Sequence, residues 1–308
     1  MRVFVTGASG HVGKAVVPDL QAAGHQVVGL ARSDASAAAL AARGVEVRRG
    51  DLDTLDVLHD ASADADGVIH LAFKHDAMVA GDLEAAATAD LAATRAIADA
   101  LAGTGKPLVG TSGTAMLGRV DLGHTGTEDD VLPGGYRIDT ENLTIELAAQ
   151  GIRTSVLRLP PTVHSSLDTE GFIPGLIALA RAKGVSGYVG DGANRWPAAH
   201  TLDVGRLYRL AVEHAPAGSR LHAVDDEGVP LRQIAEVIGR RLGVPTASIP
   251  AEDAAAHFGW LTMLVGIDNP TSSARTRQLL DWKPEHPGLL ADLEEDHYFA
   301  VSGRTASN

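Results

Sequence analysis

Short apolar runs alternate with longer helical patterns along the first half of the chain. The runs are rich in Val, Ile and Leu, and the segments between them repeat apolar residues at helical spacing. This alternation is typical of strand–helix–strand units, which build a parallel sheet with helices on both faces. We expect strands near residues 3–6, 26–30, 45–49, 67–71 and 107–111, and a long helix over residues 79–102.

The first predicted strand runs into a glycine-rich turn, where residues 3–13 read V-F-V-T-G-A-S-G-H-V-G. In such a turn the first glycine bends the chain, the second lets the backbone approach a pyrophosphate, and the third lets the following helix lie close to the strand. The amide groups at the start of that helix attract anions. A turn without a ligand is the alternative, but the order of strand, turn and helix favours a dinucleotide. We therefore predict cofactor contacts at Gly7, Ser9, Gly10, His11, Val12 and Gly13.

The second predicted strand ends in cationic and hydroxyl side chains. Arg32 and Ser33 stand where an NAD site usually places a carboxylate for the ribose 2′-hydroxyl, and Asp34 comes only afterwards. A cation at this position favours the 2′-phosphate of NADP. We predict that NADP(H) is preferred over NAD(H), with a solvated surface arginine as the alternative.

The ends of the next three predicted strands supply further candidates. A carboxylate just after the third strand can reach the adenine amino group or cap the following helix. Residues that leave the fourth and fifth strands lie at the edge where open α/β sheets bind ligands. We predict cofactor contacts there from Asp51, Leu52, Leu71, Ala72, Lys74 and Thr111.

Composition excludes several classes of function. The 308 residues carry a formal net charge of −13, so a general affinity for nucleic acid or for an anionic membrane is not expected. No cysteine is present, which removes disulfides, thiolate metal sites and cysteine nucleophiles. The sequence shows neither a signal pattern nor an apolar run of about 18 residues, so we expect a cytoplasmic protein.

Several motifs together resemble the short-chain dehydrogenase/reductase superfamily, in the extended and atypical branches that include the NAD-dependent epimerase/dehydratase enzymes. They are T-G-A-S-G-H-V-G at residues 6–13, the acid after the third strand, H-L-A at residues 70–72, and the hydroxyl-rich T-S-G-T at residues 111–114. Residues 158–164, R-L-P-P-T-V-H, resemble the family segment that lines the nicotinamide, which adds Pro160 to the cofactor contacts.

The resemblance covers most of the chain, from residue 1 to about residue 213. It implies an α/β fold: a Rossmann-type doubly wound parallel sheet with a smaller C-terminal α/β substrate lobe. We expect the dinucleotide-binding domain in residues 1–165, with residues of about 190–225 returning to it, and the substrate lobe in residues 166–308. In the lobe we expect helices at 173–183, 231–242 and 251–258, and no regular structure at 302–308.

The catalytic pair of the family is absent. Such enzymes carry Tyr and Lys four residues apart on the helix after the fifth strand, because the lysine lowers the pKa of the tyrosine that donates the proton. Here Tyr136 is followed by Thr140, and a shift of one residue instead places Arg137 at the tyrosine position and Glu141 at the lysine position. We predict that Tyr136 donates the proton, unassisted or helped by Arg137, and packing is the alternative.

The family hydroxyl that aligns the substrate is also displaced. Its position falls on Gly113, which leaves Ser112 and Thr114 on either side, and we predict Ser112 as the catalytic hydroxyl and Thr114 as a substrate contact. On the lobe side we predict substrate contacts from His164, Arg195 and Trp196. A satisfied structural histidine and a packed corner are the alternatives. The thirteen histidines show no metal-binding spacing, so no metal is expected.

These observations predict an NADP(H)-dependent oxidoreductase that transfers hydride to a small organic carbonyl, imine or activated alkene. Without the lysine, a substrate that needs little help from a general acid is as plausible as a ketone. An NAD-dependent sugar-nucleotide epimerase or dehydratase and a non-catalytic dinucleotide-sensing protein are the rivals. The expected partner is a small-molecule substrate, with neither nucleic acid nor membrane, and the resemblance allows a homodimer.

Overall fold

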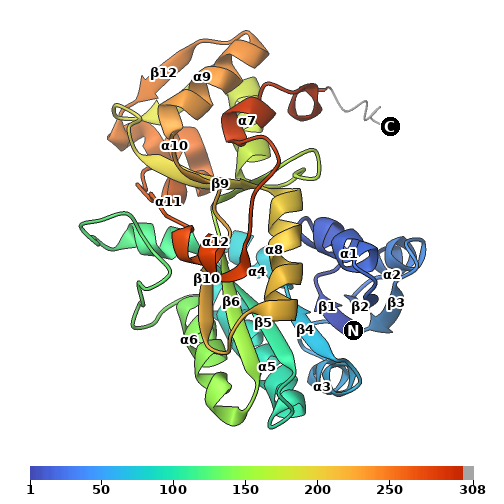
Figure 1. Ribbon diagram of the computed structural model, residues 1–308. Coiled ribbons are helices and arrows are strands. Elements are labelled where there is room, and N and C mark those ends of the chain that lie inside the picture. Colours follow the sequence, from blue (N-terminus) through green and yellow to red (C-terminus); the bar gives the residue numbers. More distant parts are fainter. Residues whose placement is uncertain (301–308) are drawn as a thin grey trace.

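The computed structural model describes residues 1–300, apart from the side chains at positions 78 and 79, so the expectation for residues 302–308 lies outside it. Seven parallel strands form the central sheet, in the order β10-β6-β5-β4-β1-β2-β3 (Figure 1). Their bounds are β1 (Arg2–Thr6), β2 (Gln26–Ala31), β3 (Glu46–Arg49), β4 (Gly67–His70), β5 (Pro107–Gly113), β6 (Arg153–Leu159) and β10 (Ser219–His222). The strand order reverses direction between β1 and β4, which is where such sheets bind ligands. The predicted doubly wound parallel sheet is confirmed.

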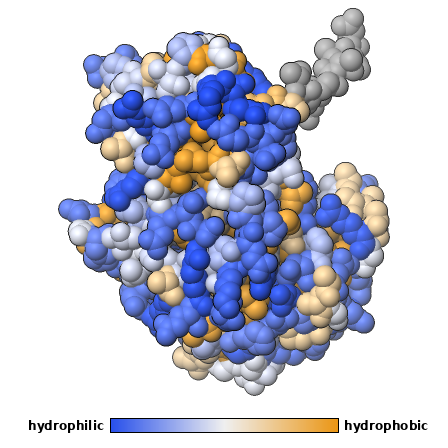
Figure 2. Space-filling view, turned by 45° about the horizontal axis from the view of Figure 1, so that its top comes forward, coloured by the Kyte–Doolittle hydropathy of each residue, from blue (hydrophilic) through white to orange (hydrophobic). Residues whose placement is uncertain are grey.

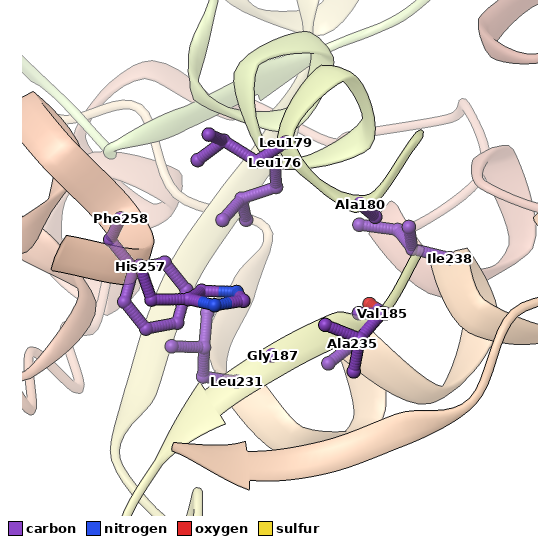
Figure 3. Close-up of a pocket in the computed structure, with 11 residues that line it drawn as sticks. Leu176, Leu179, Ala180, Val185, Gly187, Leu231, Ala235, Ile238, His257 and Phe258 are labelled. Atoms are coloured by element: carbon purple, nitrogen blue, oxygen red, sulfur yellow. The ribbon is translucent and has the colours of Figure 1, made fainter. Parts of the chain in front are cut away.

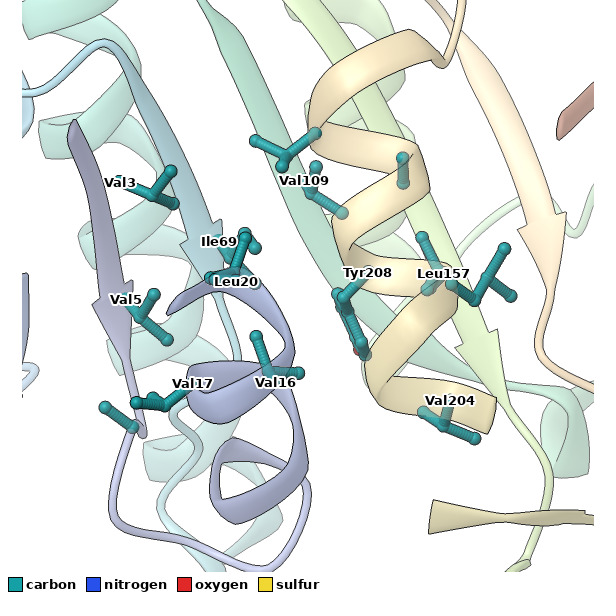
Figure 4. Close-up of a cluster of buried hydrophobic side chains, with 14 of the residues drawn as sticks. Val3, Val5, Val16, Val17, Leu20, Ile69, Val109, Leu157, Val204 and Tyr208 are labelled. Carbon is teal, nitrogen blue, oxygen red and sulfur yellow. The ribbon is translucent and has the colours of Figure 1, made fainter. Parts of the chain in front are cut away.

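Helices cover both faces of this sheet, and each face has its own hydrophobic core. On one face α1 (Gly13–Ala22) packs against α8 (Thr201–His214), and their apolar side chains meet Val3 and Val5 of β1 (Figure 4). On the other face α3 (Leu55–Ala63) and α5 (Leu83–Leu101) share a core with Phe4, and α6 (Ile138–Glu146) packs beside α5. Central parallel strands are buried on both sides, which explains their nearly continuous apolar sequences.

A smaller unit completes the molecule. It contains a three-stranded mixed sheet of β11 (Asp226–Pro230), β9 (Arg195–His200) and β7 (Thr162–His164), and a parallel pair of β8 (Ser186–Val189) and β12 (Thr246–Ile249). Its helices are α7 (Phe172–Lys183), α9 (Leu231–Leu242), α10 (Ala254–Phe258), α11 (Thr262–Val265) and α13 (Leu289–Asp292). These elements enclose the core of the smaller unit.

That core contains a small cavity beside His257 and Phe258, under Leu176 of α7 (Figure 3). Its volume of about 10 Å³ matches one water molecule, so the cavity is too small for an organic substrate.

On the outside, Figure 2 shows a hydrophobic patch on the upper part of the molecule, framed by hydrophilic residues. Trp260 and Met263, two large apolar residues of this unit, are about half exposed. Within residues 1–300 no helix is both long enough and apolar enough to cross a lipid bilayer.

The chain crosses between the two units more than once. After β9, which lies in the smaller unit, it returns to the large sheet through α8 and β10, so only the later part of residues 190–225 packs there. It then returns a second time, because α12 (Ala274–Leu280) packs against α8 and β10. Trp282 follows, fully buried in the core of the large unit, and its indole N–H donates to the carbonyl oxygen of Asp203 at 3.0 Å. The expectation that all of 226–308 belongs to the lobe missed this return.

The structure corrects several predicted elements. The helix expected at 79–102 is two helices, α4 (His75–Val79) and α5, because Asp82 caps a new helix start by accepting from the amide of Ala85 at 3.0 Å. The helix expected at 251–258 begins as a single 3₁₀ turn, and only α10 is α-helical. Arg195, predicted as a substrate contact or part of a packed corner, is the first residue of β9. The strands β7 and β11 were not predicted, because neither has a long apolar run.

Candidate active site

The glycine turn after β1 has the geometry of a dinucleotide site. Gly7 has a φ of 69°, and a Cβ at this position would lie only 2.8 Å from the backbone nitrogen of Ala72. A Cβ at Gly13 would run into the carbonyl oxygens of Gly7 and Ala8, so only glycine lets α1 begin this close to the strand. The Thr6 hydroxyl accepts from the amides of Leu71 and Ala72, at 3.1 Å each, and so ties the turn to the end of β4. These residues fit a pyrophosphate at the start of α1.

The turn also contacts the smaller unit. The ring of His11 lies 3.0 Å from the hydroxyl of Thr201 and 4.0 Å from the carboxylate of Asp168. Burial, with the charges of Lys14 and His164, lowers the pKa of His11 to about 4. Burial raises the pKa of Asp168 to about 6, although the amide of Gly171 donates to it. Ser9 and Val12 are partly buried beside this contact, and Gly10 is exposed.

Two arginines stand at the edge formed by β2 and β3. Arg32 is exposed and pairs with Asp76 at 3.0 Å. Arg49 lies directly across the ladder from Ala31, donates to the Ser33 carbonyl and pairs with Asp34 at 2.9 Å. Ser33 itself caps α2 (Asp34–Ala41) by accepting from the amide of Ser36. Arg49 was missed from the sequence, because only the pairing of the strands reveals that it lies beside Ser33.

The residues that follow β3 and β4 lie at the edge where the adenine is expected. Asp51 accepts from the amides of Asp53 and Thr54 in the turn before α3, and the N-cap residue of that helix is Thr54. Leu52 is buried in the core under α3. Lys74 pairs with both carboxylate oxygens of Asp53, at 2.6 and 2.7 Å, beside an open groove of about 500 Å³ along α5. Lys74 therefore lies at the carboxyl edge of β3 and β4, where it forms an ion pair with Asp53.

The hydroxyls at the end of β5 are buried. Thr111 bridges the carbonyl of His70 and the hydroxyl of Tyr208, at 2.7 and 2.8 Å. Ser112 is 2% exposed, and within residues 1–300 its hydroxyl has no hydrogen-bond partner. Thr114 is fully buried, and its hydroxyl accepts from the side-chain amide of Asn269 at 3.0 Å. The Thr114 hydroxyl is therefore bound by Asn269, and the Ser112 hydroxyl lies next to the Glu141 carboxylate, whose pKa it helps to lower.

Tyr136 and Arg137 lie at the start of α6, next to a phenylalanine from the loop after β4. The ring of Tyr136 meets that of Phe73 edge to face, with centroids 5.9 Å apart, and the Arg137 guanidinium stacks 4.2 Å above the same ring. Both residues are partly exposed. Burial raises the pKa of Tyr136 and Asp90 adds to the rise, while Arg137 and Arg119 oppose it. The phenol is therefore a proton donor at neutral pH rather than a tyrosinate.

A buried polar chain runs beneath this pair. The Thr6 hydroxyl already accepts two amides, so its own proton goes to Nδ1 of His70 at 2.7 Å. The other ring nitrogen of His70 then donates to Asp90 at 3.2 Å, and Asp90 lies 3.7 Å from Arg137. Burial alone would raise the pKa of Asp90, but His70 and Arg137 hold it below its usual value. Asp90 is thus a carboxylate held between a histidine and an arginine.

Asp90 was missed from the sequence, although a signal was present. The residues on the buried side of α5 are otherwise Ala, Ile, Leu and one Thr, and Asp90 is their one acid. A buried acid on an apolar helix face needs a cationic or hydrogen-bonding partner. The sequence could not show that the partners are His70 and Arg137, since they come from distant segments.

Glu141, which stands at the register of the family lysine, is locked into a closed ion-pair network. Arg158 donates to its carboxylate at 2.6 to 3.1 Å, and Arg220 donates at 2.8 Å. The side chains of Glu141 and Arg158 are both 0% exposed. Burial would raise the pKa of Glu141, but the hydrogen bonds and charges of Arg158 and Arg220 hold it low. Glu141 is therefore a permanent anion that no substrate reaches.

The predicted substrate residues of the lobe are placed mostly in packing roles. Trp196 is 1% exposed in the core of the smaller unit, and its indole donates to a backbone carbonyl. Arg195 is held by both oxygens of Asp268, at 2.8 and 3.0 Å. His164 is fully buried and pairs with Asp292 at 2.8 Å. These placements favour the packing alternatives over a pocket wall. Pro160 follows β6 and is buried.

Three residues that are distant in sequence come together where α8 begins. His200, Asp203 and His286 place their ligand atoms within 4.8 Å of one another, a grouping that the sequence spacing did not reveal. Asp203 already accepts from the ring of His286 and from the amides of Glu285 and His286. The rings of His200 and His286 stack face to face at 4.6 Å, so their in-plane lone pairs do not converge on one point. This group holds the C-terminal segment to α8. The helix α8 begins at Thr201, and the ring of His200 caps it by accepting from the amide of Leu202.

Residues 3–224 match the model of the NAD dependent epimerase/dehydratase family. An uncharacterized protein of Schizosaccharomyces pombe is 46% identical over 301 residues, which cover 97% of this chain and all of that protein. A 4-hydroxy-2-methyl-3-oxo-4-farnesyl-3,4-dihydroquinoline-1-oxide ketoreductase of Stigmatella aurantiaca is 28% identical, over 84% of this chain and 80% of the relative.

The fold is also similar to solved structures. The UDP-glucose 4-epimerase of Thermus thermophilus in complex with NAD superimposes with a TM-score of 0.75 at 20% identity, over 98% of this chain and all of that one. Identity at this level shows the shared fold alone. It supports the same arrangement of the sheet and the smaller unit.

Proposed function

The chain belongs to the NAD-dependent epimerase/dehydratase family, and from that premise we propose that it is an NADP(H)-dependent reductase. It is an NAD(P)-dependent oxidoreductase of the extended short-chain dehydrogenase/reductase type. The proposed substrate is a small organic molecule with a carbonyl, an imine or an activated double bond. The ketoreductase relative supports a reduction, and the missing lysine argues against an epimerase.

The observation that carries the cofactor proposal is the cationic edge of β2 and β3. Arg32 is exposed, and Arg49 lies beside Ser33, so two guanidinium groups face the position that an acid holds in NAD-preferring sites. A phosphate dianion matches the planar fork of arginine and the hydroxyl of Ser33. The present partners Asp76 and Asp34 are exposed, and exposed ion pairs contribute only about 0–1 kcal/mol. A phosphate can therefore replace Asp76 and Asp34 as the partner of the two arginines at little cost in free energy.

The proposed proton donor is Tyr136. When bound, the nicotinamide supplies the hydride, and the substrate carbon accepts it. The Tyr136 phenol gives its proton to the oxygen, nitrogen or carbon that develops negative charge, and water then restores the phenol. Ser112, the buried hydroxyl without a partner within residues 1–300, orients the substrate atom. The carboxylate of Asp90 and the ring of His70 hold Arg137 and the end of β4 in place.

The test is a fluorescence titration of the purified protein with NADPH and with NADH, for the wild type and for Arg32→Ala. We expect NADPH to bind at least about tenfold more tightly, a difference near 1.4 kcal/mol, and Arg32→Ala to remove most of that preference. Arg49→Ala should lower the preference as well, because both guanidinium groups face the phosphate.

Arg2→Ala is the matched control, since Arg2 pairs with Glu46 at the opposite end of the strands. The control should keep the wild-type preference. Equal or tighter binding of NADH by the wild type would overturn the NADP(H) assignment and favour an NAD-retaining epimerase. A preference unchanged in both arginine variants would show that these side chains do not contact the cofactor.

A further inference from the structure

In the register that aligns Glu141 with the family lysine, Arg137 stands at the family tyrosine position, and its surroundings distinguish it from a structural arginine. Its Nη2 donates to the carbonyl oxygen of Thr111 at 3.0 Å, near the carboxyl end of β5. The guanidinium carbon lies 4.2 Å from the centre of the Phe73 ring, and 15% of the side chain is exposed. The cation is therefore held at the edge of the sheet, beside the Tyr136 phenol.

The backbone at this point is strained. Arg137 has a φ of 66°, one of two positive values for residues other than glycine within residues 1–300. The left-handed conformation costs a residue with a Cβ about 1–2 kcal/mol. Glycine would avoid this cost, and Gly134 and Gly135 lie just before Tyr136, so the strained position falls on an arginine although glycines stand two and three residues away. Strain of this kind concentrates at functional sites, where the side chain is required.

Most of the hydrogen-bonding capacity of Arg137 is unused. A guanidinium has five N–H donors, and within residues 1–300 only the bond to Thr111 meets hydrogen-bond geometry. The nearest carboxylate, Asp90, lies 3.7 Å away and shares its charge with the ring of His70. Asp90 therefore fixes the position of the guanidinium without occupying its fork. The remaining N–H groups can donate hydrogen bonds to a second planar anion.

Two arginines face Tyr136 against one carboxylate, that of Asp90, although the chain as a whole carries −13. Arg119 ends the 3₁₀ helix after β5 (Thr114–Arg119), is exposed and has no ion-pair partner within residues 1–300. It lies close enough to Tyr136 to oppose the rise of the tyrosine pKa, as Arg137 does. Two arginines beside the proposed proton donor form a local attraction for an anion.

We propose that the substrate is a carboxylic acid whose carboxylate is bound by the fork of Arg137, with the reducible carbon within one or two bonds of it. Arg137 and Tyr136 are neighbours in the chain, so an acid held by one places its adjacent carbon next to the other. A 2-oxo acid, a 3-oxo acid or a 2,3-unsaturated acid has this geometry. The inference rests on the proposed reductase function and names its substrate class.

The test measures binding, so it does not depend on turnover. Calorimetry is carried out on the protein saturated with NADP⁺, using 2-oxo-4-phenylbutanoate, 3-oxo-3-phenylpropanoate and cinnamate, each beside its primary amide. We expect at least one acid to bind about tenfold or more tightly than its amide. Arg137→Gln should bring that ratio close to one, and Arg137→Lys should retain part of it, because lysine keeps the charge without the fork.

The control is Arg2→Gln, which removes one distant cation and should leave the ratio unchanged. The proposal is overturned if no acid binds the wild type better than its amide, or if Arg137→Gln keeps the preference. The proposed NADP(H) dependence fails separately, through the nucleotide titrations. If NAD⁺ binds instead, the acid and amide pairs are measured on that complex.

Discussion

Arg158 and Arg137 both approach helix α6 and both lie near a carboxylate, yet one belongs to a closed site and the other to an open one. Arg158 has an ordinary strand backbone, no exposed side-chain surface, and donates to Glu141 and to the carbonyl of Asp130. Its third nitrogen lies 3.2 Å from the ring of His222. Arg137 has a left-handed backbone, partial exposure and one hydrogen bond within residues 1–300.

The difference separates structural from functional charge. In the closed site every nitrogen of Arg158 has an acceptor, so removing one partner would leave an uncompensated buried charge. In the open site the backbone is strained and the donors are unused, which lowers stability unless a ligand uses them. Glu141 belongs to the closed site, and so it cannot take over the role of the family lysine. The chemistry then depends on Tyr136 and Arg137.

The largest expected effect is on the closed site. Arg158→Met should lower the free energy of unfolding by about 3–5 kcal/mol, because it leaves the Glu141 carboxylate buried beside Arg220 alone. Urea denaturation followed by circular dichroism measures this loss. Arg2→Met, which breaks an exposed pair with Glu46, should cost under about 1 kcal/mol. A loss for Arg158→Met as small as that of Arg2→Met would remove the distinction between closed and open sites.

The next effect is on turnover at the open site. Tyr136→Phe should lower kcat for reduction about 100-fold, equivalent to about 2.7 kcal/mol, because it removes the general acid. Ser112→Ala should lower it less, and NADPH affinity should change little in either variant. Steady-state kinetics with an accepted substrate provide the measurement. Unchanged turnover in both variants would remove the two residues from the mechanism.

The pH dependence of the same rate gives a sharper version of this prediction. The pKa of Tyr136 is raised, so its phenol keeps the proton to a higher pH than free tyrosine, whose pKa is about 10. Reduction should therefore show no loss of kcat from ionisation of Tyr136 between about pH 7 and pH 9. A rate that falls within this range in the wild type, but not in Tyr136→Phe, would mean that Arg137 lowers the pKa as a lysine would.

The smallest expected effect is on the stability of the open site. Arg137→Gly should lower the free energy of unfolding by less than Arg158→Met does, under about 3 kcal/mol, because relief of the left-handed backbone offsets part of the loss and Asp90 keeps the ring of His70 as its partner. Thermal denaturation of the unliganded protein measures the change in the free energy of unfolding. A loss close to that of Arg158→Met would place Arg137 among the structural arginines.

The sequence predicted those parts of the molecule that depend on local chemistry. The parallel sheet follows from repeated apolar runs, and the turn at Gly7 and Gly13 follows from spacing that only glycine satisfies. The bounds of α9 were predicted because its apolar positions repeat at helical spacing and Gly243 ends it in a left-handed conformation.

The parts that depend on distant pairing were not predictable. Trp196 and Arg195 are neighbours in the chain, but one faces a core built by α7 and α9 and the other faces Asp268. The local sequence around them does not indicate which distant residues each side chain contacts in the folded protein. The same holds for Asp90, whose histidine and arginine come from β4 and α6. A single sequence shows which residues can bear charge, and the tertiary fold decides which charges are neutralised.

The second return of the chain to the large sheet limits how this protein can be recombined. The family match ends at residue 224, yet Trp282 lies in the hydrophobic core beside α8 and is held by Asp203. A single splice after residue 224 would remove this tryptophan, leaving apolar surface of the cofactor domain in water, and would keep β7, α7, β8 and β9 of the old smaller unit. A new smaller unit can be grafted only as three separate segments, from β7 to β9, from β11 to α11, and α13. Specificity in this chain is therefore carried by several insertions, not by a separable C-terminal module.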